Sequence, residues 1–347
     1  MRNAEPLVVG VDGGGTSTRC LVATLSGEIV ARGRAGGANP RSARDPGGNL
    51  THALTEALLG LGPRFHPRDV AGGVFGLAGA SAAGRERALV LAEDAWRAAA
   101  LPGLPVVVPD ILVAFAGATP VPSGSVIIAG TGAVAARIAG RLIIRRCDGY
   151  GWLLGDEGSG VWIGRQAARA ALAALDGRGP PTALTARVLP ALLRHAPGRD
   201  AGAAPLAGEA LAQAIVAAVY DGEPARLGTL SPLVESAARE GDRVALTILD
   251  DAARLLVRTL DTVRAPDPAL PVVLAGSLLT RPTLVADRVR EALIGRTVVP
   301  AKDGAAGAAA LALRAFAAAG GPGAARDAEI EAAHRRMLAA GDTPGQA

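Results

Sequence analysis

The stretch VVGVDGGGTSTRC, residues 8–20, joins two short apolar runs through a carboxylate, three glycines and three hydroxyl side chains. Each run has the length and composition of a β-strand. Three successive glycines close a hairpin poorly, because they lose much backbone entropy on folding. They do let backbone N–H groups approach an anion closely, and Thr16 adds a hydroxyl donor. We therefore expect an anion-binding turn here, and the alternative is an ordinary hairpin with a loose turn.

Asp12 ends the first apolar run, directly before this turn. A carboxylate in that place would repel a bound phosphate. A divalent cation between the two would remove the repulsion, because carboxylate and phosphate oxygens are the ligands that hard cations prefer. The sequence therefore predicts phosphate and a divalent cation at the same turn.

The pattern of strand, Gly/Thr turn, strand, tight turn and strand occurs a second time, at residues 125–146. An internal duplication is the economical explanation. It predicts two related α/β domains that face each other across a cleft, each with one glycine-rich turn. Further strands are expected at residues 29–33, 70–77, 104–109 and 271–275, and helices at residues 49–61, 84–99, 161–175, 283–293 and 304–319.

Composition excludes several classes of protein. The 347 residues are 50% hydrophobic but only 3% aromatic, so the core must be built from Ala, Val and Leu. The net charge is +4, yet the basic residues are scattered among acids, which argues against nucleic-acid binding. Cys20 and Cys147 lie near no second Cys or His at a metal-ligand spacing. We expect Cys20 in the core and Cys147 in a loop.

One segment has the length of a membrane span. Residues 111–136 carry no charge, but turn-forming residues, TPVPSG, interrupt them at 119–124. We therefore expect a short helix and a buried strand rather than a span. The N-terminus lacks the features of a signal peptide, and we expect a cytoplasmic protein that does not bind membranes.

The second turn, Gly130-Thr131-Gly132, also fits a weak dinucleotide-binding fingerprint with Ala135. That fingerprint requires a helix after the turn, whereas residues 134–138 have the pattern of a strand. A nicotinamide-dependent oxidoreductase is therefore a minor alternative. A P-loop is excluded, because the only lysine, Lys302, follows Ala301 rather than a glycine.

Two carboxylate positions each allow two interpretations. Asp110 follows the expected strand 104–109, where it could cap a helix, act as a general base, or do both. The run Gly155-Asp156-Glu157-Gly158-Ser159 precedes a helix, whose dipole acids stabilise. Its position after Tyr150 and Trp152 favours a sugar site instead, because aromatic rings pack on sugar C–H faces and carboxylates accept hydroxyl protons.

Several polar and aromatic residues have structural interpretations. Asn39 lies in a Gly/Pro loop and by itself indicates only a turn. Trp96 and Trp162 lie in expected helices and are expected in the core. Ser159 is expected to cap the helix that follows it.

Taken together, the motifs resemble those of the acetate kinase, hexokinase and actin-type ATPase superfamily. More narrowly, the chain resembles the N-acetylglucosamine kinase family within the group of BadF and BcrA-type ATPases. The matching motifs are Asp12 to Thr16, Gly76 to Ala80, Asp110, Gly130 to Gly132, Gly149 to Ser159, and Leu274 to Ser277, in the family's order. The resemblance implies two ribonuclease H-like domains, residues 1–118 and 119–347, with a C-terminal helix packed back on the first.

The resemblance also implies roles for individual residues. The ATP phosphates would be bound by Gly13, Gly14, Gly15, Thr16, Thr131 and Gly132. The adenosine would contact Gly276 and Ser277, and Asp12 would hold Mg²⁺ through water. Asp110 would be the base that takes the proton of a sugar 6-hydroxyl. The other sugar contacts would be Asn39, Gly149, Tyr150 and Asp156.

The expected reaction is ATP-dependent phosphorylation of N-acetylglucosamine by a homodimer. The family often has Gly-Gly-Trp where this chain has Asp148-Gly149-Tyr150, which leaves glucosamine and N-acetylmuramic acid as alternative substrates. Asp148 is a candidate partner for a free amine. Two functions without sugar phosphorylation also stay open. One is a sugar-binding regulator, and the other is an ATPase that activates a partner protein, as the dehydratase activators of the superfamily do through a cysteine-held iron–sulfur cluster.

Overall fold

The computed structural model describes residues 5–40, 43–193, 206–320 and 326–340. The chain forms two compact units. Unit 1 contains Met1–Val126, Ile138–Ile144 and Val299–Ala347, and unit 2 contains Ile127–Arg137 and Arg145–Val298. The domain boundary expected near residue 118 stays a prediction.

Sheet 1 contains the stretch VVGVDGGGTSTRC, residues 8–20. Its strands are β1 (Leu7–Gly13), β2 (Ser17–Thr24), β3 (Ile29–Gly36), β4 (Val70–Leu77) and β5 (Val106–Pro109), in the order β3-β2-β1-β4-β5. The first three strands pair antiparallel, and β1, β4 and β5 run parallel. Asp12 pairs with Arg19 on β2 and with Gly76 on β4. The carboxyl ends of β1, β4 and β5 therefore meet at one edge of the sheet.

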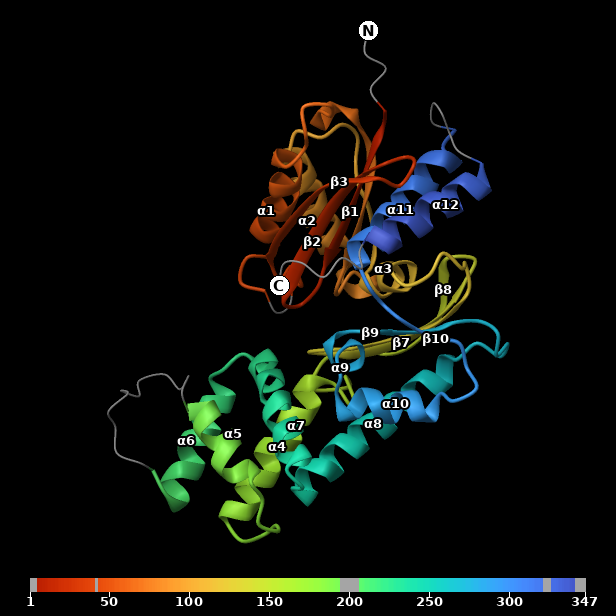
Figure 1. Cartoon of the computed structure of the whole chain (residues 1–347). Coiled ribbons are helices and arrows are strands. Elements are labelled where there is room, and N and C mark those ends of the chain that lie inside the picture. The colour runs from red at the N-terminus through yellow and green to blue at the C-terminus, as the bar shows by residue number, and fades with distance from the viewer. Residues whose placement is uncertain (1–4, 41–42, 194–205, 321–325, 341–347) are drawn as a thin grey trace. The chain divides into compact units, whose positions relative to one another are not determined.

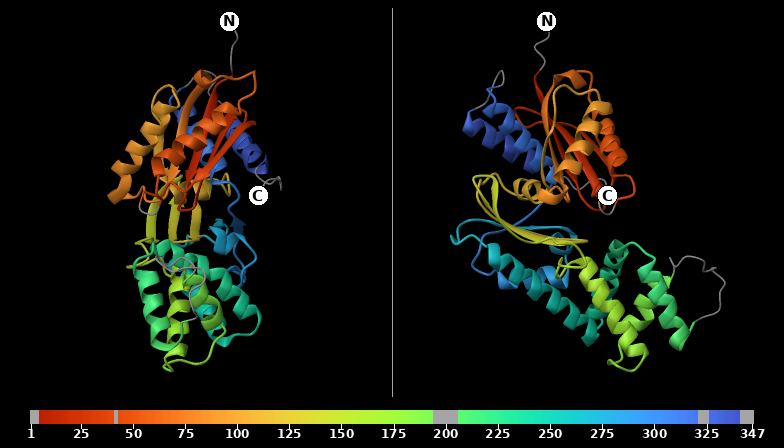
Figure 2. Two further views of the ribbon diagram at one scale, coloured as in Figure 1. Left: turned by 90° about the vertical axis from the view of Figure 1, so that its left-hand side faces the viewer. Right: turned by 180° about the vertical axis from the view of Figure 1, so that it is seen from behind.

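Both faces of sheet 1 are covered by helices, because alternate residues of its strands point to opposite faces. On one face, Val9 and Val11 pack with α1 (Pro46–Leu59) and α2 (Arg85–Ala98); on the other, Val8 packs with α11 (Gly304–Ala318) and α12 (Asp327–Ala340) (Figures 1 and 2). A Cβ atom at Gly10 would lie 2.1 Å from the carbonyl oxygen of Ala305. The glycine therefore lets α11 approach β1 closely.

Sheet 2 repeats the strand order of sheet 1. Its strands are β6 (Gly124–Ala129), β7 (Ala133–Ala139), β8 (Leu142–Asp148), β9 (Val272–Ala275) and β10 (Val298–Pro300), in the order β10-β9-β6-β7-β8. Read from its other edge, the order of sheet 2 is β8-β7-β6-β9-β10. Three strands that are consecutive in the chain come first, in reverse order, and two later strands follow them, as in β3-β2-β1-β4-β5 of sheet 1. The expected duplication is therefore confirmed in the topology.

The remaining helices include the short α3 (Asp110–Ala116) in unit 1. The helices of unit 2 are α4 (Gly160–Leu175), α5 (Leu184–Leu193), α6 (Gly208–Tyr220), α7 (Ser231–Arg239), α8 (Arg243–Val263), α9 (Ser277–Thr280) and α10 (Leu284–Ala292). The described part of the chain also contains 3-10 helices at Pro67–Asp69, Ala82–Gly84 and Pro224–Leu230. In unit 2, Ile127 of β6 and Leu274 of β9 share one apolar core with Ile163 of α4 and Leu256 of α8.

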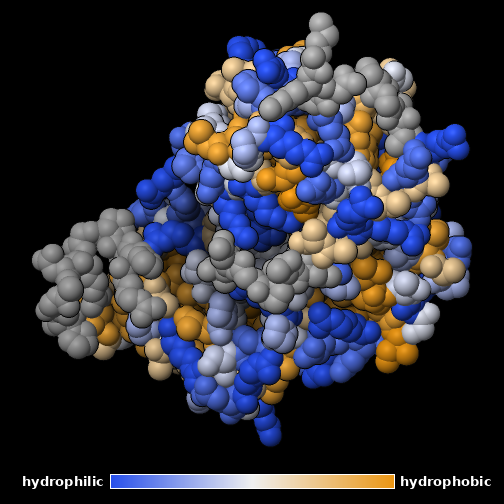
Figure 3. All heavy atoms as spheres, turned by 45° about the horizontal axis from the view of Figure 1, so that its top comes forward, coloured by the Kyte–Doolittle hydropathy of each residue, from blue (hydrophilic) through white to orange (hydrophobic). Residues whose placement is uncertain are grey.

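Most of the expected elements are confirmed, with a few differences. Among the described residues, β10, α9 and the 3-10 helices were not expected, and no residue range was predicted for the C-terminal helix α12. Cys20 and Trp96 are buried, as expected, and the Trp96 ring packs edge-on against Phe75. Trp162 is only partly buried, and the assignment of Cys147 to a loop is wrong, because it lies in β8. On the face shown in Figure 3, apolar side chains are interspersed among hydrophilic ones.

Candidate functional site

The first glycine-rich turn is fixed by backbone contacts at the edge of sheet 1. The N–H of Gly14 donates to the Ser17 carbonyl at 3.0 Å. A Cβ atom at Gly13 would lie 2.6 Å from a methyl carbon of Leu77, and one at Gly37 would lie 2.2 Å from the Gly15 carbonyl oxygen. Only glycine fits at position 37, because any other residue would displace the backbone of the turn. Gly15 and Thr16 are exposed, so the tip of the turn is open to a ligand.

The Asp12 carboxylate lies at this edge near two other acids of unit 1. Burial raises the pKa of its carboxyl to about 7, the negative charges of Asp110 and Asp303 add to the rise, and Arg19 opposes it. A divalent cation beside Asp12 would relieve this repulsion, so the residue type and setting fit Mg²⁺. Among the described residues no three Asp, Glu, His or Cys side chains are grouped closely enough to hold a metal. Water and phosphate would therefore have to complete the ligand set.

Asp303 is a third acid that the sequence analysis missed. Its carboxylate accepts the N–H groups of Ala305 and Ala306, which caps α11, and its other oxygen lies 2.7 Å from Arg32. This cap places the start of α11 against Asp12, because a Cβ atom at Gly304 would fall 2.3 Å from Asp12 Oδ2. The acid directly before an alanine-rich helix was the available signal.

Asp110 is the first residue of α3 rather than its cap. The N-cap residue is Pro109, and Asp110 Oδ1 accepts the N–H of Ile111 at 3.0 Å. The interpretation of Asp110 as a helix cap is therefore wrong. A Cβ atom at Gly76 would lie 2.2 Å from Val113, so α3 packs directly on β4. This contact fixes the carboxylate at the same sheet edge as Asp12.

Asn39 lies over the first turn. Its N–H and that of Ala38 both donate to the Gly14 carbonyl, at 3.2 and 2.9 Å. A Cβ atom at Gly79 would lie 3.4 Å from Asn39 Oδ1. The Gly/Pro loop therefore brings an amide side chain to the edge that carries Asp12 and Asp110.

The second glycine-rich turn organises unit 2. The N–H of Gly160 donates to the Gly130 carbonyl at 2.7 Å, so the turn is bound to the start of α4. Ser159 caps that helix by accepting the Trp162 N–H at 3.2 Å, as expected. The turn is followed by β7 and not by a helix, so the dinucleotide-binding alternative is wrong.

The expected adenosine contacts adjoin this turn. Gly276 has a φ of 83°, and a Cβ atom there would fall 2.3 Å from the Ala129 carbonyl oxygen, so only glycine fits. A Cβ atom at Gly130 would lie 3.9 Å from both the N–H nitrogen and the hydroxyl oxygen of Ser277. In unit 2, the second glycine-rich turn therefore lies next to the expected adenosine contacts Gly276 and Ser277.

The sugar motif forms a loop between β8 and α4. Tyr150 is 67% exposed, and Gly149 has a φ of 76°. Burial raises the pKa of the Asp156 carboxyl and the Asp148 charge adds to the rise, whereas N–H groups of Ala133 and Gly151 donate to it and oppose the rise. Asp148 is buried, and its oxygens accept backbone N–H groups. These bonds indicate that Asp148 shapes the loop, and its suggested role as a partner of a free amine stays a prediction.

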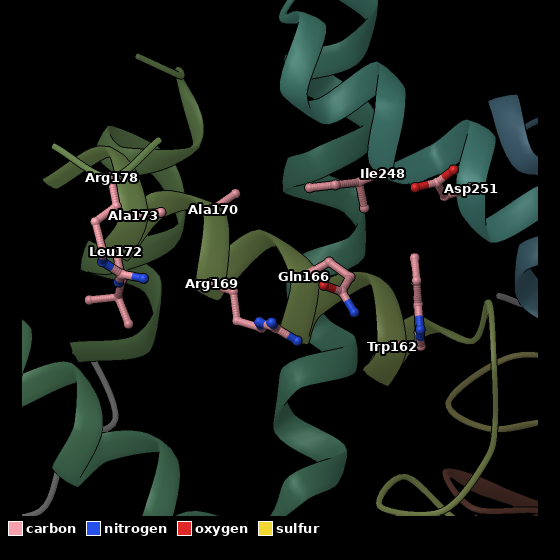
Figure 4. Close-up of a pocket in the computed structure, with 9 residues that line it drawn as sticks. All are labelled: Trp162, Gln166, Arg169, Ala170, Leu172, Ala173, Arg178, Ile248 and Asp251. Atoms are coloured by element: carbon pink, nitrogen blue, oxygen red, sulfur yellow. The ribbon is translucent and has the colours of Figure 1, made fainter. Parts of the chain in front are cut away.

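The structure thus gathers the predicted residues into two groups. Asp12 to Thr16, Asn39 and Asp110 lie at one edge of sheet 1, and Thr131, Gly132, Gly149, Tyr150, Asp156, Gly276 and Ser277 lie around the second turn. A pocket of about 490 Å³ elsewhere in unit 2 is lined by residues of α4 and α8, among them Trp162, Gln166, Arg169, Ile248 and Asp251 (Figure 4). It contains none of the predicted site residues. In the described part of the chain, no helix is both long and apolar enough to span a membrane.

Comparison with known proteins agrees with this arrangement. A model of the BadF/BadG/BcrA/BcrD ATPase family matches residues 9–312. An N-acetylmuramic acid/N-acetylglucosamine kinase of Clostridium acetobutylicum is 29% identical over 260 residues, which is 74% of this chain and 78% of the relative. An N-acetyl-D-glucosamine kinase of Dictyostelium discoideum is 27% identical over 308 residues, 82% of this chain and 89% of the relative.

Solved structures are similar over most of their length. A Chromobacterium violaceum protein provisionally named N-acetylglucosamine kinase has a TM-score of 0.67 at 26% identity, over 89% of this chain and 99% of that one. A ROK family glucokinase of Streptomyces griseus, solved with glucose and AMPPNP, has a TM-score of 0.52 at 21% identity, with 89% and 99% covered. The second likeness shows a shared fold.

Proposed function

We propose, from the premise that this chain belongs to the BadF/BadG/BcrA/BcrD ATPase family, that it is an ATP-dependent amino-sugar kinase. The acceptor is the 6-hydroxyl of the sugar, with N-acetylglucosamine as the first candidate. The observation that carries the proposal is the meeting of the Asp110 carboxylate, Asp12 and the glycine-rich turn at one sheet edge. The names of two curated relatives support the substrate class.

Phosphoryl transfer needs positioning and charge neutralisation more than covalent help. The backbone of Gly13 to Thr16 and that of Thr131 and Gly132 would hold the ATP phosphates, and Gly276 and Ser277 would adjoin the adenosine. Asp12 would hold Mg²⁺ through water, and the bound ion would neutralise charge on the phosphates. Burial and neighbouring acids raise the pKa of Asp12, and a cation beside it would favour its charged form.

The sugar would lie at Asp110, which takes the 6-hydroxyl proton as phosphate is transferred. Asp110 Oδ1 accepts the N–H of Ile111, which orients the carboxylate, and an ionised carboxylate is a hydrogen-bond acceptor of the kind that a general base requires. Asn39, Gly149, Tyr150 and Asp156 would bind the other sugar groups. The exposed Tyr150 ring suits stacking on a sugar face.

Among acceptors, N-acetylmuramic acid is the second candidate, because the Clostridium relative is named for both sugars. A partner-activating ATPase is disfavoured, because Cys20 is buried and Cys147 packs partly buried against the core of unit 2, which is a poor setting for ligands of a shared cluster. Intact Asp12, Asp110 and both glycine-rich turns argue against a regulator without catalysis. The homodimer and the cytoplasmic location stay predictions.

ADP release tests the proposal, with Mg-ATP and a panel of N-acetylglucosamine, glucosamine, N-acetylmuramic acid, N-acetylmannosamine, glucose and no sugar. We expect rapid release only with an amino sugar, and the phosphate in the product on the 6-oxygen by ³¹P NMR. Equal release without sugar would overturn the kinase assignment and favour an ATPase.

A further inference from the structure

The loop between β8 and α4 is built around one buried carboxylate. Asp148 Oδ1 accepts the N–H of Gly149 at 2.7 Å and that of Asp156 at 2.8 Å, and Oδ2 accepts the N–H of Glu157 at 2.9 Å. Asp148 is only 7% exposed. The side chain thus joins the two ends of a loop whose middle carries Tyr150 and Trp152.

The backbone of this loop takes conformations that it would not keep without support. Asp148 and Asp156 have φ angles of 63° and 54°, which are strained for residues with a Cβ atom. A Cβ atom at Gly155 would fall 2.2 Å from Asp148 Oδ1, so the carboxylate and the glycine fit together. The three N–H bonds to Asp148 help to hold both strained positions in place, beside bonds from Arg146 to the Gly149 carbonyl and from Arg165 to the Trp152 carbonyl.

The held loop in turn places Asp156. The carboxylate of Asp156 accepts N–H groups of Ala133 and Gly151, and a Cβ atom at Gly132 would lie 2.9 Å from its Oδ2. One acid therefore holds the loop, and a second acid ties the loop to the glycine-rich turn. Both lie in unit 2, and their oxygens face backbone donors.

We propose that Asp148 is a positioning residue that preorganises residues 149–157, so that Asp156 and Tyr150 meet the amino sugar without a cost for ordering the loop. The inference rests on the proposed kinase function and deepens it. In this role Asp148 acts on sugar binding through the loop, because its oxygens accept N–H groups of the loop backbone. Its loss therefore weakens sugar binding and leaves the transfer step at Asp110 nearly intact.

The test compares Asp148→Asn and Asp148→Ala with a matched control, Asp242→Asn. Asp242 is also a carboxylate of unit 2 that accepts backbone N–H groups, from Ala183 at 2.6 Å and Ala245 at 2.8 Å, but it lies outside the loop. Thermal unfolding shows that each variant is folded before it is assayed. Asp148→Asn keeps an acceptor oxygen and a similar volume, and serves if the alanine variant does not fold.

Two readouts are taken on the full chain. Hydrogen exchange without ligands is followed in peptides that cover residues 149–157, and we expect at least tenfold faster exchange in the alanine variant, a smaller increase in the asparagine variant, and no increase in the control. With the preferred sugar, we expect KM to rise at least tenfold and kcat to change less than threefold.

The outcomes separate this inference from the function on which it rests. If hydrogen exchange of residues 149–157 is unchanged in the alanine variant, Asp148 does not hold the loop. Faster exchange with an unchanged KM would overturn the positioning role alone. If the unmodified protein phosphorylates no amino sugar, the proposed function fails and the positioning role with it, while the exchange data still decide whether Asp148 holds the loop.

Discussion

The Asp12 carboxylate occupies the space that a side chain at Gly304 would need, because a Cβ atom there would fall 2.3 Å from Asp12 Oδ2. The two residues are far apart in sequence, and they meet because α11 begins against the end of β1. Gly304 is the first residue of α11, and because it has no side chain, the Asp12 carboxylate can occupy this space.

The Gly304→Ala variant tests this contact. Alanine is a better helix former than glycine, so stability should change by less than about 1 kcal/mol. Ordinary contact begins at 3.4 Å, so the new methyl group should push the Asp12 carboxylate aside by about 1 Å. A misplacement of about 1 Å can lower turnover by about 100-fold. Steady-state kinetics with saturating ATP and sugar measure the loss.

Gly72→Ala is the matched control for that variant, since a Cβ atom at Gly72 would have nothing within 4 Å. It should keep full activity. Normal turnover of Gly304→Ala would show that the position of Asp12 is not critical.

Asp12 should also make stability depend on pH. The native pKa of its carboxyl is about 7 and the ordinary value is 3.8, so the folded state binds more protons between these pH values. Stability contributed by this group therefore falls as pH rises from about 4 to 7. Asp12→Asn should be more stable than the unmodified protein at pH 8, by about 1 to 2 kcal/mol, and inactive as a kinase. Urea unfolding at pH 4 and pH 8 checks the sign, and equal differences at both pH values would contradict it.

His334 should give the opposite slope. Burial lowers the pKa of its imidazole to about 4, Arg314 and Arg141 add to the lowering, and the bond to the Ala116 carbonyl and the charge of Glu331 oppose it. Because the unfolded chain takes up the proton first, stability falls as pH drops from 6.5 towards 4, by up to about 1.4 kcal/mol per pH unit.

The His334→Gln variant should not lose stability in this way at acidic pH, because glutamine does not titrate. Its side-chain amide can still donate to the Ala116 carbonyl. The difference in unfolding free energy between variant and unmodified protein should therefore change across pH 6.5 to 4. His52→Gln, at an exposed position of α1, is the control. Parallel pH profiles of the His334 variant and the unmodified protein would refute the prediction.

The parts of the fold that local sequence determines were predictable. Apolar runs bounded by glycine indicated the strands on both sides of Asp12, and the repeat of that pattern predicted the duplicated strand order. The strand β10 has only three residues, Val298–Pro300, which is too short for a periodic signal. The helix α12 is marked by no clear cap, and its burial depends on packing against α11.

Within the candidate site, the sequence predicted residues better than their contacts. Asp110 and Asp12 were identified from their positions after strands. Asp303 was missed because its proximity to Asp12 depends on how α11 packs on sheet 1. The bonds that Asp148 accepts from the backbone of its loop were not predicted, since bonds from nearby backbone N–H groups to a carboxylate leave no trace in composition.

The base assignment is tested most directly by the Asp110→Asn variant, with kcat measured under saturating ATP and sugar and with the sugar Kd measured by calorimetry. Loss of a general base should lower kcat by about 100-fold or more and change Kd less than threefold. Asp45→Asn, which removes a carboxylate that caps α1 in the same unit, should alter neither. Turnover of Asp110→Asn within threefold of the unmodified protein would contradict the assignment of Asp110 as the base.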